Sequence, residues 1–583
     1  MENETKNCQN CKKNFTIETE DFKFYERIKM PSPTFCPECR LARKLTWRNE
    51  RSLYKRSCDL CKKDIISMYK QGVSFPVYCH ECWWGDEWSP LDYGQDCDFN
   101  ISFFEQFKKL QKTVPRAASY ATKNVNSEYC NYTAHMKGSY LMFGSWFSEN
   151  CGYGQTVLSS KECWDCVFVR DCELCFGSTD CTKCNQVLFS KQCTACIDST
   201  FIYDCRNCQN CLFCYNLRSK NYHIFNKPVS KEEFNKTKQE IFSSRSTLQN
   251  AKNKFKKIVQ ENAIHRFMTG EHNQNVSGEF ISNSKNVHKS YYIDNGENEK
   301  YAVRGGIGQK DTFDGFGVHA GELCYECNNI DFSSRCFFAI NGENNMNSEY
   351  LLDCDHVNNS FGNISVRKKE YCILNKQYSR EEYAALVEKV KKNMEEMPYL
   401  DKKGKIYKYG EFFPFEFSPH AYNETLAQEY IPINEDGAKK LGYSWDSIEE
   451  KGYVPTKNWK DLPESIEETD NDILSEIILC EAWDKNKNEA QNHKCTKAFK
   501  ITQNELNMYR KWNIPLPTKC PNTRYFEMFK ERNLIKLWHR ACMCEKENHQ
   551  HGAEKCENEF ETSYSPDRTE TVYCETCYQQ EIY

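Results

Sequence analysis

The sequence predicts a mainly β protein with some helix, in which paired-cysteine modules at both ends flank a repetitive, cysteine-rich middle. Three observations support this fold class. CxxC pairs recur near both ends, cysteines recur at a fixed interval through the middle, and Ser-x-x-Glu signals mark helix starts behind the repetitive segments. The chain has 583 residues, 39% hydrophobic and 14% aromatic, which is enough to bury several cores.

Composition narrows the classes of function. The net charge is −5, so binding of nucleic acid would require a local basic patch. The polar start MENETKNCQN predicts no signal peptide, and no run of about 18 apolar residues predicts a membrane span. Without a secretory signal, the 36 cysteines favour metal sites or buried thiols over disulfides. We therefore expect a reducing, cytoplasmic location, with a virion component as the alternative.

The N-terminal module, residues 1–95, contains two sets of paired cysteines. Zn²⁺ takes four thiolates in a tetrahedron, and two CxxC pairs on neighbouring hairpins supply them. Because each set fills all four positions, both predicted sites are structural. The first set is Cys8, Cys11, Cys36 and Cys39, and the second is Cys58, Cys61, Cys79 and Cys82.

The C-terminal module, residues 471–583, is a degenerate copy of the N-terminal one. CKKNFTIETEDFKFYERIKMPSPTFCPECR aligns with CTKAFKITQNELNMYRKWNIPLPTKCPNTR, which pairs Cys11 with Cys495 and Cys36 with Cys520. In this alignment Asn492 and Thr523 replace the other two ligands, Cys8 and Cys39. The first C-terminal site is therefore predicted to bind no zinc, unless His493 and a distant residue substitute.

The second C-terminal site keeps Cys556, Cys574 and Cys577, and either Cys542 or Cys544 is the predicted fourth ligand. His549 and His551, in the insertion between these cysteines, are the next candidates. About three structural zinc ions are therefore expected in the whole chain.

The pattern CxxC…F…FY……P..CPxCR resembles the small probable zinc-ribbon domains of bacterial and giant-virus proteins. The whole arrangement resembles large zinc-ribbon proteins of reduced-genome bacteria. The match covers both ends well and the middle loosely. It implies zinc binding by Cys8, Cys11, Cys36 and Cys39, and it implies no activity.

Residues 96–226 contain cysteines at a constant interval. Their 21-residue period predicts one coil of a parallel β-solenoid, in which equivalent positions stack from turn to turn. Stacked cysteines would be small buried thiols of the core. A further zinc site and redox or cluster chemistry are the alternatives. The repeated positions are Cys130, Cys151, Cys172, Cys193 and Cys214, with a second series at Cys163, Cys184 and Cys205. The extra zinc site would use Cys172, Cys175, Cys193 and Cys196.

Two capping signals divide the rest of the middle. Ser230 with Glu233 predicts a helix over about 231–266, inside a capping or bridging segment of residues 227–269. Ser379 with Glu382 predicts another helix over about 380–397. Between them, residues 270–377 are a second solenoid-like unit with a weaker repeat. Residues 378–470 are that second helix followed by an acidic linker, which is either ordered or simply solvated.

The stretch RLARKLTWRNERSLYKR is the clearest candidate for binding a partner. If the stretch is a helix, its cationic and aromatic side chains lie on one face. Such a face could bind the phosphates and bases of RNA or DNA. The alternative is that these side chains pair with carboxylates inside the protein. The residues on the face are Arg40, Arg43, Lys44, Trp47, Arg48, Arg51, Tyr54 and Lys55.

Taken together, the sequence favours a non-enzymatic, zinc-binding modular scaffold that interacts with a protein partner. Zinc modules at both ends would flank two short parallel β-solenoid units capped by helices. A nucleic-acid-binding protein is the first alternative. The second is a polysaccharide-active β-helix enzyme that uses Asp311, Asp314 and His319, although the glycines around them are typical of turns.

Overall fold

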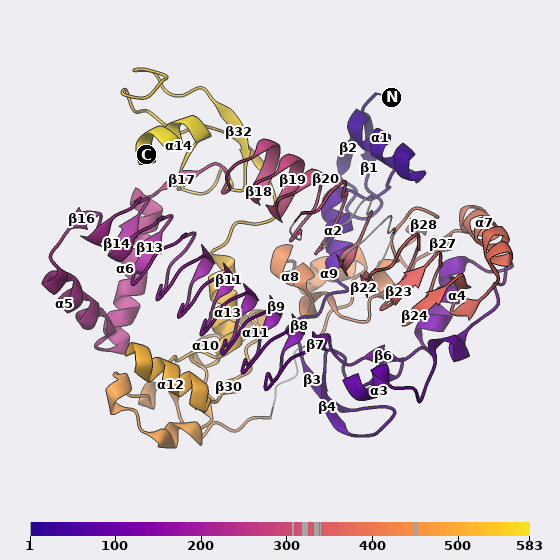
Figure 1. Ribbon diagram of the computed structural model, residues 1–583, viewed down its shortest axis with the longest axis horizontal. Helices are drawn as coiled ribbons and strands as arrows, with labels where there is room; N and C mark the ends of the chain where they lie inside the picture. Colours follow the sequence, from indigo (N-terminus) through magenta and orange to yellow (C-terminus); the bar gives the residue numbers. More distant parts are fainter. Residues whose placement is uncertain (1, 306–307, 318–324, 332–336, 338–339, 448–451) are drawn as a thin grey trace.

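The computed structural model describes residues 2–305, 308–317, 325–331, 337, 340–447 and 452–583 (Figure 1). Two small cysteine modules come first, followed by a coil of stacked strands, two helices and a second coil. A further helix, an aromatic-rich segment and two more cysteine modules complete the chain. We call residues 121–226 the first coil and residues 274–377 the second coil.

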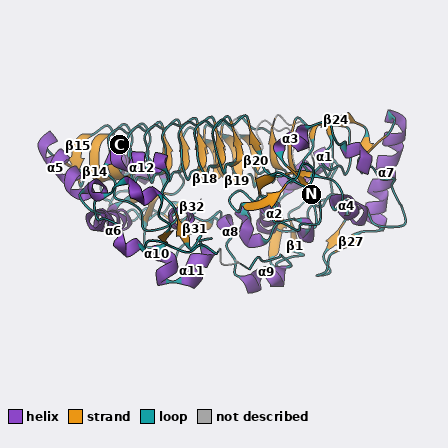
Figure 2. Ribbon diagram, turned by 90° about the horizontal axis from the view of Figure 1, so that it is seen from below, coloured by secondary structure: helices purple, strands orange, loops and turns teal. Residues whose placement is uncertain are grey.

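The first coil is built from 12-residue turns. Gln155 pairs in parallel with Val167, and Val167 pairs with Thr179. Figure 2 shows the turns stacked in a row. The predicted 21-residue step is therefore wrong. The strands are β7 (Ala121–Thr122), β8 (Asn131–Ala134), β9 (Phe143–Trp146), β10 (Gln155–Leu158), β11 (Val167–Arg170), β12 (Thr179–Thr182), β13 (Thr200–Tyr203), β14 (Gln209–Tyr215) and β15 (Asn221–Ile224), closed by the short β16 (Lys227–Pro228).

A corner occurs at every third residue of the first coil. From Lys123 to Phe225, each third residue has a left-handed backbone conformation, which gives four corners in a 12-residue turn. Asn and Asp are frequent at these corners because they tolerate this conformation better than most residues. For other side chains the conformation costs about 1–2 kcal/mol. Hydrogen bonds between turns compensate, such as the one from the Gln192 N–H to the Thr179 carbonyl (3.0 Å).

From Cys130 to Cys214, the residue after each corner is buried inside the coil, and this position explains the cysteines. The N–H of Cys163 donates to Sγ of Cys151 one turn earlier (3.4 Å), and the Cys163 thiol lies within bonding distance of the Lys161 carbonyl oxygen (3.4 Å). At an equivalent position, the hydroxyl oxygen of Ser160 accepts the N–H of Cys172 (3.1 Å). Small side chains that both donate and accept therefore satisfy backbone groups that point into a narrow core.

The second coil is built in the same way with fewer cysteines. Asp355 pairs with Arg367 at the 12-residue step, whereas Glu297 pairs with Lys310 one residue further on. Asn363 accepts the inward N–H of Asn375 (2.7 Å). The strands are β18 (Gln274–Ser282), β19 (Lys285–Asp294), β20 (Glu297–Lys300), β21 (Asn328–Asp331), β22 (Ile340–Glu343), β23 (Asp355–Asn358) and β24 (Arg367–Glu370), followed by the hairpin β25 (Cys372–Ile373) and β26 (Lys376–Gln377).

The two coils lie side by side and run in opposite directions. Arg206, late in the first coil, pairs with Glu271 just before the second (2.6 Å). Earlier in the first coil, Arg170 pairs with Asp294 (2.8 Å). Residue numbers therefore rise along one coil as they fall along the other.

Helices cover the far ends of the coils (Figure 1). The helix α7 (Arg380–Glu396) begins at the predicted capping box of Ser379 and Glu382. The predicted helix over 231–266 is two helices, α5 (Lys231–Phe242) and α6 (Arg245–Asn262), which pack on β13, β14 and β15. At the other end, α4 (Phe103–Gln111) packs against α7. Covering the last strands protects edges that would otherwise be open to pairing.

The segment expected to be a linker forms part of the main core. Phe412, Phe413, Phe415 and Phe417 are buried, and the Phe413 ring lies 5.0 Å from that of Phe107. Its elements are β27 (Tyr399–Leu400), β28 (Ile406–Tyr407), α8 (Leu426–Tyr430) and α9 (Glu435–Leu441), with short 3-10 helices between them. No described helix combines the length and the apolar character that a membrane crossing requires.

Candidate metal centres

We number the four small cysteine modules 1 to 4 in chain order, so that modules 1 and 2 form the N-terminal module and modules 3 and 4 the C-terminal one. Module 1 brings the first predicted cysteine set together. Cys8 and Cys11 lie on the turn between β1 (Glu4–Asn7) and β2 (Asn14–Ile17), and Cys36 and Cys39 lie at the N-terminus of α2 (Pro37–Leu45). All four Sγ atoms are within 4.8 Å of one another. Sγ of Cys11 is 3.7 Å from that of Cys36, and the Cys36 N–H donates to Sγ of Cys8 (3.3 Å).

Module 2 repeats this geometry with the second predicted set. Cys58 and Cys61 lie on the turn between β3 (Tyr54–Ser57) and β4 (Asp64–Ser67), and Cys79 and Cys82 lie at the start of α3 (His80–Trp84). Sγ of Cys61 is 3.8 Å from that of Cys79, and the Cys79 N–H donates to Sγ of Cys58 (3.2 Å).

In module 3 three cysteines converge, where the alignment left two. Cys480, Cys495 and Cys520 form a group, and the Cys520 N–H donates to Sγ of Cys480 (3.2 Å), as Cys36 does to Cys8. Cys480 therefore takes the place that the alignment assigned to Asn492. Thr523 occupies the fourth place, its hydroxyl oxygen 3.2 Å from Sγ of Cys520. The helices of the module are α10 (Glu481–Lys485), α11 (Lys487–Asn492), α12 (Gln503–Trp512) and α13 (Pro521–Lys530), with the strands β29 (Ile478–Leu479) and β30 (Ala498–Phe499).

His493 is not part of this group. Its ring stacks on that of Phe526 at 6.1 Å between centroids. Sequence reasoning missed Cys480 because it lies well before Cys495 in the chain, outside any CxxC pair. The one feature of the sequence that could have indicated Cys480 is that it is a cysteine just before the aligned region.

In module 4, Cys542 rather than Cys544 lies with the three other predicted cysteines. Cys542, Cys556, Cys574 and Cys577 form one group, in which the Cys574 N–H donates to Sγ of Cys542 (3.2 Å). Cys544 belongs to a second group with His549, His551 and the same Cys577. The elements of the module are β31 (Trp538–Ala541), β32 (Glu559–Thr562), β33 (Thr571–Tyr573) and α14 (Glu575–Ile582), and β33 pairs with β17 (Ile264–Arg266).

The sulfur spacing suits tetrahedral coordination. In modules 3 and 4 the corresponding Sγ–Sγ distances are 3.6 Å between Cys495 and Cys520, and 3.9 Å between Cys556 and Cys574. A metal with four sulfurs at about 2.3 Å has sulfurs about 3.8 Å apart. The four groups can therefore hold metal ions.

Electrostatics favours one thiolate in each module. The pKa of Cys8, Cys58, Cys520 and Cys574 is lowered, whereas burial and neighbouring thiols raise that of others, such as Cys82 and Cys577. Burial opposes ionisation of Cys58, but N–H groups of Cys79, Cys61 and Leu60 outweigh it and hold its pKa at about 7. Each second cysteine pair begins at the N-terminus of a helix, where the helix dipole stabilises negative charge. In the first coil the directions are also mixed: burial raises the pKa of Cys130 to about 11, whereas hydrogen bonds with Cys175 and Cys184 lower that of Cys172 to about 5.

The structure does not assemble the extra zinc site of the first coil. Because of the 12-residue turn, Cys172 stacks on Cys184, and Cys193 stacks on Cys181 and Cys205. Cys172, Cys175, Cys193 and Cys196 form no group of converging ligands among the described residues. These side chains are buried in the coil core.

The predicted basic face is not exposed. The helix α2 ends at Leu45, and Arg40, Arg43, Lys44, Trp47, Arg48 and Arg51 are all buried. Arg43 pairs with Glu326 (2.7 Å) and Glu411 (3.3 Å). Tyr54 is half-buried against Glu424, and of the eight residues Lys55 alone is exposed. Carboxylates thus pair with Arg40, Arg43, Lys44 and Arg48 inside the protein, whereas Arg51 lies over the rings of Phe143 and Tyr525.

The candidate catalytic carboxylates are also used internally. Asp314 is fully buried and pairs with Arg40 (2.9 Å), and Asp311 lies 3.4 Å from Arg27. His319 lies outside the described residues.

Two comparisons with known proteins found no match for the chain. No family model matches it, and no curated protein is significantly similar to it. The resemblance to zinc-ribbon proteins therefore remains a prediction from the motif. What the structure adds is a set of cysteine groups, near both ends of the chain, that could hold metal ions.

Proposed function

We propose that the protein is a zinc-stabilised, non-enzymatic scaffold in which four metal modules dock onto two β-solenoids and stabilise them. In this proposal the two coils are the solenoids, and zinc is the metal because sets of three or four thiolates suit it best. The role of the metal is to hold each module in the shape that docks onto a coil.

The observation that carries this proposal is a repeated contact. Arg40 in module 1 and Arg524 in module 3 occupy aligned positions, each one helical turn after Cys36 and Cys520 respectively. Arg40 pairs with Asp314 at a corner of the second coil (2.9 Å). Arg524 pairs with Asp165 at a corner of the first coil (2.9 Å). Each module copy therefore binds a different coil with an equivalent arginine.

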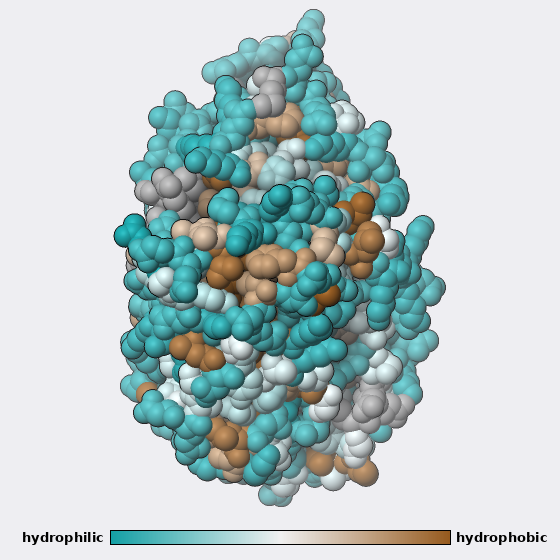
Figure 3. Space-filling model, turned by 90° about the vertical axis from the view of Figure 1, so that its right-hand side faces the viewer, coloured by the Kyte–Doolittle hydropathy of each residue, from teal (hydrophilic) through white to brown (hydrophobic). Residues whose placement is uncertain are grey.

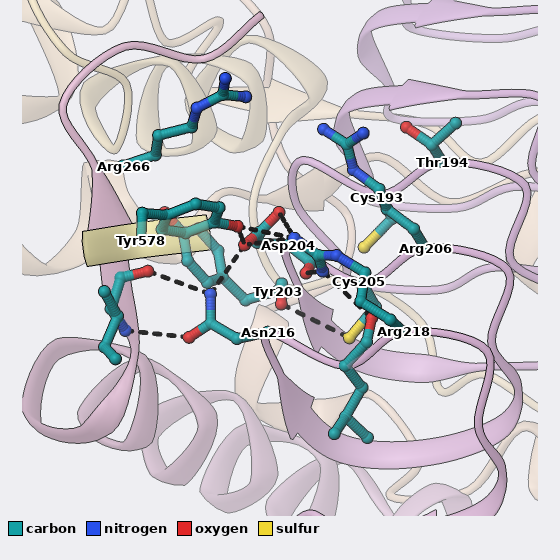
Figure 4. A network of polar contacts seen from close by, with 12 residues as sticks. Cys193, Thr194, Tyr203, Asp204, Cys205, Arg206, Asn216, Arg218, Arg266 and Tyr578 are labelled. Atoms are coloured by element: carbon teal, nitrogen blue, oxygen red, sulfur yellow. Dashed lines mark hydrogen bonds and ion pairs between the residues drawn. The ribbon is translucent and has the colours of Figure 1, made fainter. Parts of the chain in front are cut away.

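Modules 2 and 4 make further contacts of this kind. The guanidinium of Arg367 in the second coil lies over the Trp83 ring of α3 (4.7 Å). Tyr578, next to the ligand Cys577, donates to Asp204 at a corner of the first coil. Figure 4 shows this network, in which Asp204 also accepts from Asn216 (2.7 Å) and Arg218 (3.2 Å). The hollow beside it holds about 20 Å³, enough for a single water molecule.

A protein is the partner that we propose for the scaffold. The end of the molecule that carries α7 is mainly hydrophilic, with scattered hydrophobic patches (Figure 3). Leu400 and Ile406 pair across the β27–β28 hairpin and remain 61% and 41% exposed. Nucleic acid is not proposed as the ligand of the Arg40–Lys55 face, because nearly all of that face is buried.

Replacing Arg524 by Met tests the docking role. Removing one partner of a buried ion pair leaves Asp165 uncompensated and costs about 3–5 kcal/mol of unfolding free energy. Hydrogen exchange should show faster exchange in the first coil around Asp165 while zinc remains bound.

Lys530→Met is the matched control on the same helix, because Lys530 is 60% exposed and should contribute less than about 1 kcal/mol. Removing zinc with a chelator should likewise give faster hydrogen exchange, now in the part of each coil that a module contacts. Unchanged exchange in both coils after zinc removal would contradict the proposed function.

A further inference from the structure

We propose that module 4 holds two metal ions that share the Cys577 thiolate. The inference rests on the proposed metal binding of this module and extends it to a second, mixed cysteine–histidine site. One ion would have the ligands Cys542, Cys556, Cys574 and Cys577, and the second Cys544, His549, His551 and Cys577.

Two complete sets of converging ligand atoms support this. Within each set all ligand atoms lie within 4.8 Å of one another. In the second set, Nδ1 of His549 is 3.1 Å and Nε2 of His551 is 3.4 Å from Sγ of Cys544. A tetrahedron of two sulfurs and two imidazole nitrogens around zinc has S···N edges of about 3.5 Å, so the His551 separation matches it and the His549 separation is about 0.4 Å shorter.

The other nitrogen of each histidine faces an acceptor. Nε2 of His549 is buried and lies 3.3 Å from a carboxylate oxygen of Glu581, outside hydrogen-bond geometry. Nδ1 of His551 lies 2.6 Å from the Glu554 carbonyl oxygen. Metal-binding histidines nearly always place their second N–H against a carboxylate or carbonyl, because this fixes the tautomer and aims the free nitrogen at the metal. Here the nitrogens left free are the two that converge on Cys544.

The local chain also explains why only module 4 has this second set. In modules 1 and 2 the first two ligands form a CxxC pair, whereas a long insertion separates Cys542 from Cys556. The similar stretch between Cys480 and Cys495 in module 3 carries a single histidine, His493, whose ring stacks on Phe526. The insertion in module 4 supplies Cys544, His549 and His551. His549 and Cys544 are buried, so the insertion folds back over the first site rather than into solvent.

Charge favours the shared thiolate. Zn²⁺ with four thiolates is a dianion, and the module buries it. A second Zn²⁺ held by one additional thiolate and two neutral imidazoles reduces the net charge to a monoanion. Since burying charge is costly, the second cation stabilises the first site.

Metal content of the full-length protein loaded with Zn²⁺ alone tests the proposal. The variant His549→Ala/His551→Ala should bind one zinc equivalent less than the wild type, whereas Cys577→Ser should bind up to two less. His539→Ala is the control, because His539 is exposed and outside both sets. An equal zinc content in the double histidine variant and the wild type would overturn the second ion.

A Cys556→Ser variant distinguishes the proposed metal binding of module 4 from the proposed second ion. If it loses zinc while the double histidine variant does not, module 4 binds one ion and only the second ion is wrong. If neither variant loses zinc, metal binding by module 4 fails as a whole.

X-ray absorption of the wild-type zinc protein gives a test that needs no variant. It should show imidazole ligands, which no other group among the described residues provides, and a zinc–zinc distance of about 3.5–4 Å. A pure sulfur shell would contradict the proposal.

Discussion

Cysteines in the modules and cysteines in the first coil share the same CxxC spacing but differ in where their side chains point. Cys36 and Cys39 begin a helix and converge with two other thiols on one point. Cys172 and Cys175 occupy adjacent inward positions of a turn, each stacked along the coil axis. In the coil, CxxC arises because every third residue faces inward. Spacing alone therefore does not distinguish a metal ligand from a core thiol.

What separates the two groups is the number of thiols that meet and the backbone donors around them. In the modules, sulfurs face one another at 3.6–3.9 Å. In the coil, sulfurs accept N–H groups one turn away and donate to carbonyls, as serines do at equivalent positions. The modules thus need cysteine, whereas the coil needs a small side chain that forms hydrogen bonds.

Cys36→Ser should have the largest effect. It removes one ligand of the module 1 site, and loss of a structural zinc ion should cost more than about 4 kcal/mol of unfolding free energy. Thermal unfolding and zinc content measured on the same sample check this. Retention of both would exclude a structural metal ion in module 1.

Thr523→Cys should have the next largest effect, with the opposite sign. A fourth thiolate completes the module 3 set, so the zinc affinity of that site should rise at least about tenfold, or about 1.4 kcal/mol. Competition with a chromogenic chelator measures it. Cys39→Thr is the reciprocal control and should lower the affinity of module 1; no change in either variant would contradict the equivalence of Cys39 and Thr523.

Cys151→Ala should have an effect of similar size on stability, and Cys151→Ser the smallest effect of all. Alanine leaves the buried N–H of Cys163 without its acceptor, at a cost of about 1–3 kcal/mol. Serine preserves the hydrogen bond, so its cost should stay below about 1 kcal/mol. Chemical denaturation of the two variants, with zinc content unchanged in both, checks the difference. Equal losses for serine and alanine would disprove the hydrogen-bonding role.

The sequence predicted the local parts of the metal groups but not their distant members. CxxC pairs identify Cys8 to Cys39 and Cys58 to Cys82, because turn and helix start lie close in the chain. Cys480 joins module 3 only through the folded backbone. The carboxylate partners of the basic face could not be predicted either. Glu326 and Glu411 are distant from Arg43 in the sequence and contact it only in the folded protein.

The repeat length was wrong for a physical reason. Inward positions recur at every third residue, so any multiple of three looks periodic, and the predicted period is seven such triplets. The true turn is four triplets long because four corners close it, and the sequence does not mark which corner begins a turn. The helix start after Ser379, by contrast, depends on a few adjacent residues, and the structure confirms it.

Differential alkylation of the native protein, read by mass spectrometry with and without a zinc chelator, tests the central distinction most directly. The account predicts that chelation exposes the module cysteines, from Cys8 to Cys82 and from Cys480 to Cys577, to rapid modification. The cysteines of the first coil, from Cys130 to Cys214, should stay protected until the protein unfolds. Equal modification of both groups on chelation, or of neither, would contradict it.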